Sequence, residues 1–377
     1  MDAMKVSRPR RSRGLLMTLA VVASAVAVGC GSDKPDEGGG GASTSGGSGE
    51  TASNGSICVS SLVGFAIVPD LLRIWEDTAN KNNMEFSSTI ASPEGDLKSA
   101  QSNVNSCVRK KSKVTVNITT PDATLQAPIK QTTAAGNFFV GQYSGAPVEG
   151  GTMSLSPDDP AMSKLLFDWA KENLADKGTK PVVLPLTTSA FPVVVNRIGS
   201  FSKLAKDAGW KVLGPQELRP DKVAADATSK TAAALRSNPD VNIILAYTDD
   251  VTAGAAPAVR DANKQDQVKV LAWEGLEPTY AEMRAGKSLV AAIAGAPIQI
   301  MNDLQVWAVR GMLDGTFKKG SVWRCVGPLI TTDNVPPKGE PNKGGSCEEG
   351  TEVDDLGAVV NGKTYTADQL TEMAAQQ

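Results

Sequence analysis

From Ser56 onward, short runs rich in β-branched residues alternate along the chain with longer segments of helical periodicity. A repeated β-then-α order predicts parallel strands whose connecting helices cover both faces of a sheet. Nine predicted strands are too many for one small sheet, so two doubly wound domains fit best. The fold class that we expect is therefore α/β, with two parallel-sheet domains.

The individual elements follow from the same pattern, and turn residues such as Gly209 and Pro239 separate them. The predicted strands are 57–62, 84–90, 114–118, 138–141, 182–186, 210–213, 241–246, 268–273 and 289–293. The predicted helices are 68–81, 95–110, 122–134, 160–175, 192–208, 221–236, 252–263 and 298–313. The tail differs in character. Residues 335–350 are rich in Pro, Gly and Lys and predict an irregular loop, and 366–375 predicts a helix with Thr366 as its N-cap.

The N-terminal thirty residues predict export. A basic head precedes a charge-free run over 14–29, which is followed by Cys30. This order is typical of a secretory signal. The string Ala27-Val28-Gly29-Cys30 resembles a bacterial lipobox, although its first position more often carries Leu. We therefore predict a signal peptide over 1–29, lipidation of Cys30 and a Gly/Ser-rich tether over 30–55. The alternative is a plain secreted protein with an incidental cysteine.

Composition excludes several functions. The chain contains no histidine, which rules out Ser-His-Asp and Cys-His nucleophile systems and zinc sites that need imidazole. Its net charge is −3, so electrostatics gives no case for nucleic acid as a partner. The basic cluster at 109–113 lies at the end of a predicted helix, where it fits solvated residues that complement the helix dipole. We predict no metal site, no cofactor and no enzymatic activity.

Four cysteines remain besides Cys30, and an exported chain meets oxidising conditions. None of them forms a C-x-x-C pair, so a thiolate zinc cluster is disfavoured. Two disulfides are the better interpretation, with three connectivities open.

Several strings resemble the sugar-type, ribose-binding-protein-like solute receptors of ABC importers, over about residues 56–335. They are "SNPDVNIILAYTDDVTAGAAPAVRDA", "VKVLAWEGLEPTYAEMRAGKSLVAAIAGAP" and "VNITTPDATLQAPIKQTTAAG". The resemblance implies two α/β domains joined by crossover strands, with a ligand cleft between them. It implies one domain over 56–155 plus 296–330, a second over 156–295, and a tail over 331–377.

The resemblance also selects candidate ligand-binding residues, most of them at strand ends, where parallel sheets place their ligands. They are Phe65, Asn117, Gln142, Tyr143, Phe191, Arg197, Thr248, Asp249, Trp273 and Glu274. Gln142 and Tyr143 stand where the family often carries an Asp-Arg pair, and Arg197 lies two positions from a family arginine. The alternatives are a loop-capping role for Asn117, an N-cap role for Asp249, a solvent-exposed carboxylate at Glu274 and a core role for the aromatic residues.

The expected topology also suggests the disulfide pairs. Cys58 opens the first strand, and Cys107 ends the helix that leads into the third strand, which would lie beside the first. We therefore expect Cys58–Cys107, and Cys325–Cys347 would close the tail onto the last crossover.

These observations favour an extracytoplasmic lipoprotein, monomeric and membrane-anchored, that captures a small polar metabolite, with a sugar first, for an ABC permease. A ligand-sensing lipoprotein for a signalling partner would have the same binding domain. An extracellular enzyme is disfavoured by the absent histidine. A transcriptional repressor is disfavoured because no helix-turn-helix precedes Ser56.

Overall fold

The computed structural model describes residues 53–92, 95–178, 180–355 and 357–376. The predicted signal peptide, Cys30 and nearly all of the predicted tether lie outside the described residues. Within them, no helix is long and apolar enough to cross a membrane. The described residues form one compact unit with two sheets, and its fold class is α/β, as predicted.

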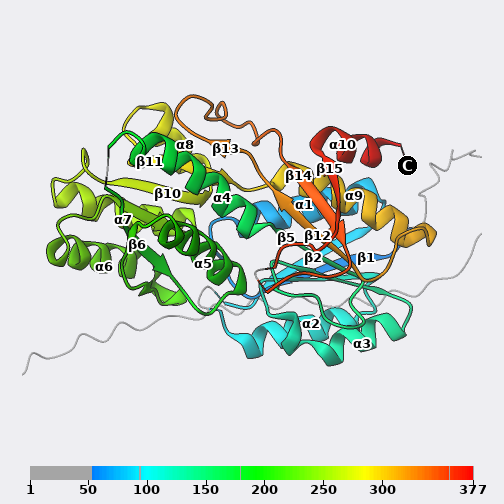
Figure 1. Cartoon of the computed structure of the whole chain (residues 1–377). Helices are drawn as coiled ribbons and strands as arrows, with labels where there is room; N and C mark the ends of the chain where they lie inside the picture. Colours follow the sequence, from blue (N-terminus) through cyan, green and yellow to red (C-terminus); the bar gives the residue numbers. More distant parts are fainter. Residues whose placement is uncertain (1–52, 93–94, 179, 356, 377) are drawn as a thin grey trace, which may run out of the picture. The chain divides into compact units, whose positions relative to one another are not determined.

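The first sheet has eight strands in the order β15-β14-β12-β5-β4-β3-β1-β2 (Figure 1). Its first six strands in chain order are parallel, and β14 and β15 add as an antiparallel pair at one edge. The strands are β1 (Ser56–Ser61), β2 (Glu85–Ile90), β3 (Val114–Ile118), β4 (Phe138–Gln142), β5 (Met153–Pro157), β12 (Ser321–Val326), β14 (Ser346–Gly350) and β15 (Lys363–Thr366).

Helices pack in pairs on this sheet because each has one apolar face to bury. Helix α1 packs against α9, and α2 packs against α3 (Figure 1). Helix α10 extends the layer of α9. The helices are α1 (Val68–Lys81), α2 (Leu97–Arg109), α3 (Gln126–Ala134), α9 (Ile298–Asp314) and α10 (Ala367–Ala375). Together with the first sheet they form what we call the first lobe.

The second sheet has the order β13-β11-β10-β9-β6-β7, with β8 paired to β6. All of its strands are parallel except β13, which pairs antiparallel with β11. The strands are β6 (Val182–Thr187), β7 (Lys211–Val212), β8 (Gln216–Glu217), β9 (Ile243–Ala246), β10 (Lys269–Glu274), β11 (Val290–Gly295) and β13 (Leu329–Ile330).

Two helix pairs, α4 with α5 and α6 with α7, cover the second sheet. The helices of this second lobe are α4 (Asp159–Ala170), α5 (Pro192–Asp207), α6 (Val223–Ser237), α7 (Asp249–Asp261) and α8 (Glu277–Arg284). The chain passes between the lobes after β5, after β11, after β12 and after β13. These passages match the expected crossover connections, while the predicted domain boundaries stay a prediction.

The predicted strands all form, but β5, β8, β12, β13, β14 and β15 were not predicted, nor was α8. The prediction of an irregular loop over 335–350 is wrong in its last part, because Ser346–Gly350 pairs with both β12 and β15. The helix prediction at the C-terminus is confirmed. Thr366 caps α10 through a capping box with Gln369.

Both expected disulfides are present. Cys58 on β1 bonds Cys107 on α2, and β1 does lie beside β3. Cys325 on β12 bonds Cys347 on β14, at paired positions of the two strands. The two bonds fasten a covering helix and the tail to the first sheet.

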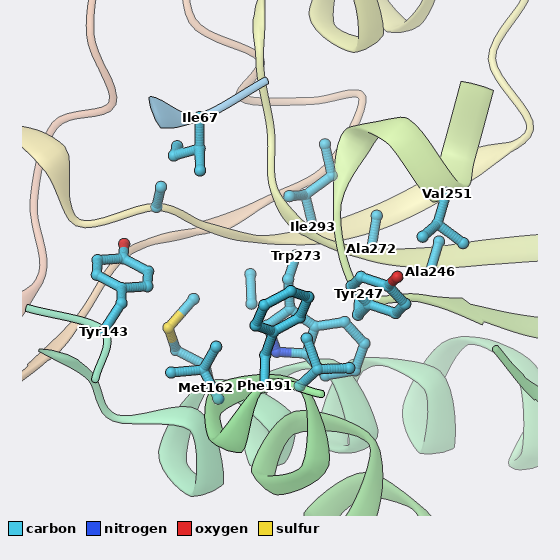
Figure 2. Packing of buried hydrophobic residues seen from close by; sticks show 14 of the residues in the cluster. Ile67, Tyr143, Met162, Phe191, Ala246, Tyr247, Val251, Ala272, Trp273 and Ile293 are labelled. Carbon is cyan, nitrogen blue, oxygen red and sulfur yellow. The ribbon is translucent and has the colours of Figure 1, made fainter. Parts of the chain in front are cut away.

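The apolar core continues from one lobe into the other. Ile67 and Tyr143 from the first lobe and Phe191, Tyr247 and Trp273 from the second belong to one buried cluster (Figure 2). The lobes therefore meet through apolar side chains as well as through the chain crossings.

Candidate ligand-binding site between the lobes

The candidate residues gather at the carboxyl ends of parallel strands in both sheets. Asn117 lies in β3 and Gln142 ends β4 in the first lobe. Trp273 and Glu274 end β10 in the second. Parallel strands present their following loops at one edge of the sheet, which is where ligands bind in such folds. The predicted placement of these strand ends is confirmed, and their contact with a ligand stays a prediction.

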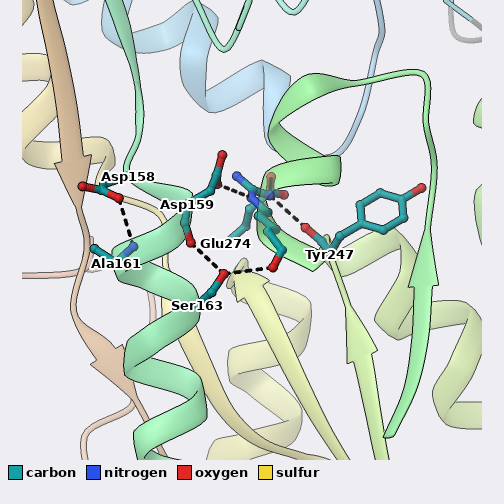
Figure 3. A network of polar contacts seen from close by, with 7 residues as sticks. Asp158, Asp159, Ala161, Ser163, Tyr247 and Glu274 are labelled. Carbon is teal, nitrogen blue, oxygen red and sulfur yellow. Dashed lines mark hydrogen bonds and ion pairs between the residues drawn. The ribbon is translucent and has the colours of Figure 1, made fainter. Parts of the chain in front are cut away.

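A buried ion-pair cluster around Arg197 lies at this level (Figure 3). Arg197 on α5 donates from Nε to Asp159 Oδ1 at 2.8 Å and from Nη1 to Glu274 Oε1 at 3.0 Å. Its Nη1 also donates to the carbonyl oxygen of Tyr247 at 2.8 Å. Asp159 begins α4 just after the first crossing, so this cluster ties the crossing to α5 and β10. We call Asp159, Arg197 and Glu274 the buried triad.

Burial decides the titration of the triad. Desolvation raises the pKa of Glu274 to about 7 and that of Asp159 to about 6, although Arg197 acts in the opposite direction on both. The two carboxylates in turn raise the pKa of Arg197, against the effect of burial. One guanidinium thus faces two carboxyl groups, and the triad carries no spare positive charge for an acidic ligand.

Glu274 sits on a turn that needs an unusual backbone. Its φ is +80°, in the left-handed region, and φ of the following Gly275 is +77°. Such a conformation costs about 1–3 kcal/mol for a residue with a side chain. A Cβ on Gly275 would also lie 2.4 Å from the Tyr280 hydroxyl oxygen. The surrounding packing therefore holds the Glu274 carboxyl in one place.

Several buried polar atoms near the triad have no hydrogen-bond partner: Tyr143 Oη, Trp273 Nε1 and Glu274 Oε2. Tyr143 also has a left-handed backbone, with φ of 56°, and burial raises the pKa of its hydroxyl, with smaller effects from Arg197, Glu274 and Asp159. Buried polar groups are nearly always paired in folded proteins. Unpaired polar groups that come from both lobes are what a site for a polar ligand requires.

The faces of the lobes meet beside this cluster. Phe65, between β1 and α1, packs edge-on against Phe191, just before α5, with ring centroids 5.2 Å apart. The backbone N–H of Ala66 donates to Asp250 Oδ2 at 3.2 Å. Phe65 remains partly exposed, whereas Phe191 is buried. These contacts bring both predicted aromatic residues to the junction of the lobes.

The other predicted site residues make structural hydrogen bonds. Asn117 donates to Asp122 Oδ1 at 2.7 Å and to Thr120, and Gln142 accepts from Trp75 Nε1 at 2.7 Å. For these residues, as for the triad, a ligand contact stays a prediction.

Thr248 and Asp249, which follow β9, do not cap α7 through their side chains, contrary to the N-cap role considered for Asp249. Thr248, not Asp249, is the N-cap of α7. Asp249 instead accepts from the backbone of Gly275 and Leu276 and from the Thr279 hydroxyl, which fixes the loop before α8. Thr248 Oγ1 is buried without a partner.

Sequence reasoning missed Asp159 and Arg324, which line a cavity of about 200 Å³ between the lobes. Arg324 lies in β12 and Asp159 shortly follows β5, and neither strand was predicted. The available signal was the Asp158-Asp159-Pro160 string, in which Asp158 caps α4 by accepting from Ala161 N. A second cavity of about 370 Å³ lies between α1, α8 and the tail. Among the described residues, no cluster of acidic or cysteine side chains could hold a metal ion.

Comparisons with known proteins agree with this architecture. A model of the periplasmic binding protein domain matches residues 71–316. A 5-methylthioribose transporter solute-binding protein from Thermotoga lettingae has a TM-score of 0.66 at 18% identity, covering 74% of this chain and 86% of its own. A sugar ABC transporter protein from Yersinia enterocolitica has a TM-score of 0.66 at 16% identity, covering 86% and 96%.

A protein from Actinobacillus succinogenes, solved with D-allose, has a TM-score of 0.63 at 16% identity, covering 74% of this chain and 98% of its own. No match was found among curated protein sequences.

Proposed function

We propose a binding function for this chain, which belongs to the family of periplasmic binding protein domains. In this proposal it is the extracytoplasmic receptor of an ABC importer, and it captures an uncharged sugar or polyol between its lobes. It performs no chemistry on that ligand. The observation that carries the proposal is the buried triad, with unpaired Tyr143, Trp273 and Glu274 atoms around it.

The charge of the site supports an uncharged ligand. The single guanidinium of Arg197 is already shared by two carboxyl groups, so a ligand carboxylate or phosphate would meet net negative charge. Hydroxyl groups both donate and accept, which suits an unpaired carboxylate oxygen, an indole N–H and a phenol. Structurally similar proteins were solved with 5-methylthioribose, β-D-fucofuranose and D-allose, all of which carry several hydroxyl groups.

Capture would work by closure. A ligand that touches both lobes gains contacts in the closed form that the open form lacks, so binding shifts the population towards closed. A permease could then recognise the closed arrangement. Lipidation of Cys30 would keep the receptor at the membrane, and that part of the proposal rests on the sequence alone.

The test is calorimetric titration of the purified full chain with a panel of uncharged sugars and polyols that includes D-allose, D-fucose, allitol and 5-methylthioribose. We expect at least one to bind with 1:1 stoichiometry and to alter tryptophan fluorescence. Binding of acidic metabolites alone, or turnover of a bound sugar, would contradict the proposed function. If Cys30→Ala leaves membrane association unchanged, the proposed lipid anchor is contradicted, but the proposed ligand binding is not.

A further inference from the structure

The cavity of about 200 Å³ beside the buried triad has walls from several separate parts of the chain. Ser156 and Asp159 come from β5 and the crossing that follows it, and Asn196 comes from α5. Arg324 comes from β12, and the tail closes one side around Gly357. We call this cavity the Arg324 pocket. It holds the volume of roughly seven liquid waters, which suits a small ligand.

Arg324 is a buried cation without an ionic partner. The residue is 3% exposed, and among the described residues no carboxylate forms an ion pair with it, although Asp159, Asp158 and Asp122 act on it electrostatically. Nε donates to Gly357 O at 2.9 Å, Nη1 to Ser154 Oγ and Trp323 O, and Nη2 to Gly145 O at 3.3 Å. Desolvation lowers the pKa of Arg324 to about 10. A guanidinium has five N–H groups, so one remains beyond these four bonds.

Ser156 supplies a second unused group in the same pocket. Its side chain is 4% exposed, and its Oγ has no hydrogen-bond partner. Ser156 pairs with Arg324 in the parallel register of β5 and β12, so both side chains lie on the same face of the sheet. The Ser156 hydroxyl and the remaining Arg324 N–H line the same cavity, where both can form hydrogen bonds with a ligand.

The charges around the pocket define the ligand class. Besides Arg324 it is lined by Asp159, Asp354 and Asp355, so carboxylates outnumber the guanidinium. An anionic ligand would meet this excess, whereas hydroxyl groups can accept from Arg324 and donate to a carboxylate. Asp159 also belongs to the buried triad, so the pocket and the candidate site share one side chain.

We propose that the Arg324 pocket binds vicinal hydroxyl groups of the captured uncharged sugar, through Ser156 and Arg324 from the first lobe and Asn196 from the second. This inference rests on the proposed function and adds to it a subsite that the C-terminal tail partly encloses. The segment around Gly357 holds the Arg324 guanidinium in position through its carbonyl group. The tail therefore takes part in ligand selection.

The test compares Ser156→Ala and Asn196→Ala with Ser202→Ala, which lies in a separate groove on the outer side of α5. All are measured in the full chain by calorimetry with the tightest-binding sugar of the panel. We expect Ser156→Ala and Asn196→Ala each to weaken binding by roughly 3- to 10-fold, as for a lost ligand hydrogen bond, and Ser202→Ala to leave it unchanged. Thermal unfolding of each variant checks that it is folded.

A paired ligand adds a second readout. D-Galacturonate carries a carboxylate where D-fucose carries a methyl group, and we expect D-fucose to bind more tightly. If Ser156→Ala and Asn196→Ala bind the sugar as the parent does, the subsite is wrong while the proposed function can stand. If D-galacturonate is preferred over D-fucose, the subsite and the uncharged-ligand part of the proposed function both fail. If the parent binds no sugar or polyol of the panel, both proposals fail.

Discussion

At the scale of single residues, buried carboxyl groups distinguish this site. Glu274 and Asp159 share Arg197, and Asp122 is buried against Asn117, where desolvation raises its pKa to about 7. The chain has no histidine, so the side chains that usually titrate near neutral pH are absent. Proton uptake by the folded protein between pH 5 and 8 must therefore come largely from such carboxyl groups.

The sign of the pH dependence follows from the raised pKa values. Glu274 has an ordinary pKa of 4.5 and a folded-state pKa of about 7. A carboxyl group that binds its proton more tightly when folded adds stability below pH 4.5, and that contribution is lost as pH rises through 7. We expect the free energy of unfolding to fall between pH 5 and 8, and Glu274→Gln to flatten this fall. Urea unfolding across that range measures it, and equal slopes in parent and variant would refute the assignment.

Tyr143 gives a second residue-scale prediction. Its hydroxyl oxygen is buried without a partner, so Tyr143→Phe removes a costly unpaired group. We expect the variant to be as stable as the parent or more so, and to bind the sugar roughly 5-fold or more weakly if the hydroxyl contacts it. Thermal unfolding and calorimetry separate the two effects. A stable variant with parental affinity would remove Tyr143 from the site.

At the scale of elements, the tail is an integral part of the first sheet. The Cys325–Cys347 bond joins β12 to β14, and β15 then leads into α10, which packs on α9. The tail also contacts the second lobe, because Arg284 Nη1 donates to Pro336 O and Tyr280 Oη donates to Asn342 Oδ1 at 2.7 Å. A segment that was expected to be irregular thus spans both lobes.

Removing each disulfide should cost stability in proportion to the loop that it closes. The sequence separations are 49 residues for Cys58–Cys107 and 22 for Cys325–Cys347. In the chain-entropy model these loops are worth about 4 and about 3 kcal/mol. We expect Cys58→Ala with Cys107→Ala to lower the free energy of unfolding by more than Cys325→Ala with Cys347→Ala. Denaturant titrations under oxidising conditions test this order. A larger loss of unfolding free energy in the Cys325→Ala, Cys347→Ala variant would contradict the chain-entropy model.

Sequence reasoning succeeded where the signal was local and failed where it was not. Helix α1 and strand β3 were predicted at their observed limits, because periodicity and turn residues mark them. Strands β5 and β14 were missed because Ser, Pro, Glu and Gly interrupt their short sequences, and β12 was missed because its parallel partner β5 lies far away in the chain. The missed strands carry Ser156 and Arg324, and Asp159 directly follows β5. The residues on Glu274's side of the site could thus be predicted, whereas the Arg324 pocket could not.

At the scale of the whole molecule, the proposed mechanism makes ligand affinity depend on the junction between the lobes. The Phe65–Phe191 contact and the bond from Ala66 N to Asp250 Oδ2 join the two lobes. In the proposed mechanism, these contacts favour the closed arrangement even without ligand. When only a fraction of the molecules is in the closed, binding-competent state, the apparent affinity for ligand is reduced by that fraction. A change that lowers the closed fraction therefore weakens binding.

Asp250→Ala should therefore weaken ligand binding although Asp250 lies outside the proposed set of ligand contacts. The bond is exposed, so it is worth only about 0.5–1 kcal/mol, and we expect the dissociation constant to rise roughly 2- to 5-fold. Small-angle scattering of the ligand-free variant should give a larger radius of gyration than the parent, and saturating sugar should bring the two together. Asp261→Ala, at the other end of α7, is the matched control and should change neither quantity. A ligand-free radius equal to the parent's, with unchanged affinity, would mean that this contact does not hold the lobes closed.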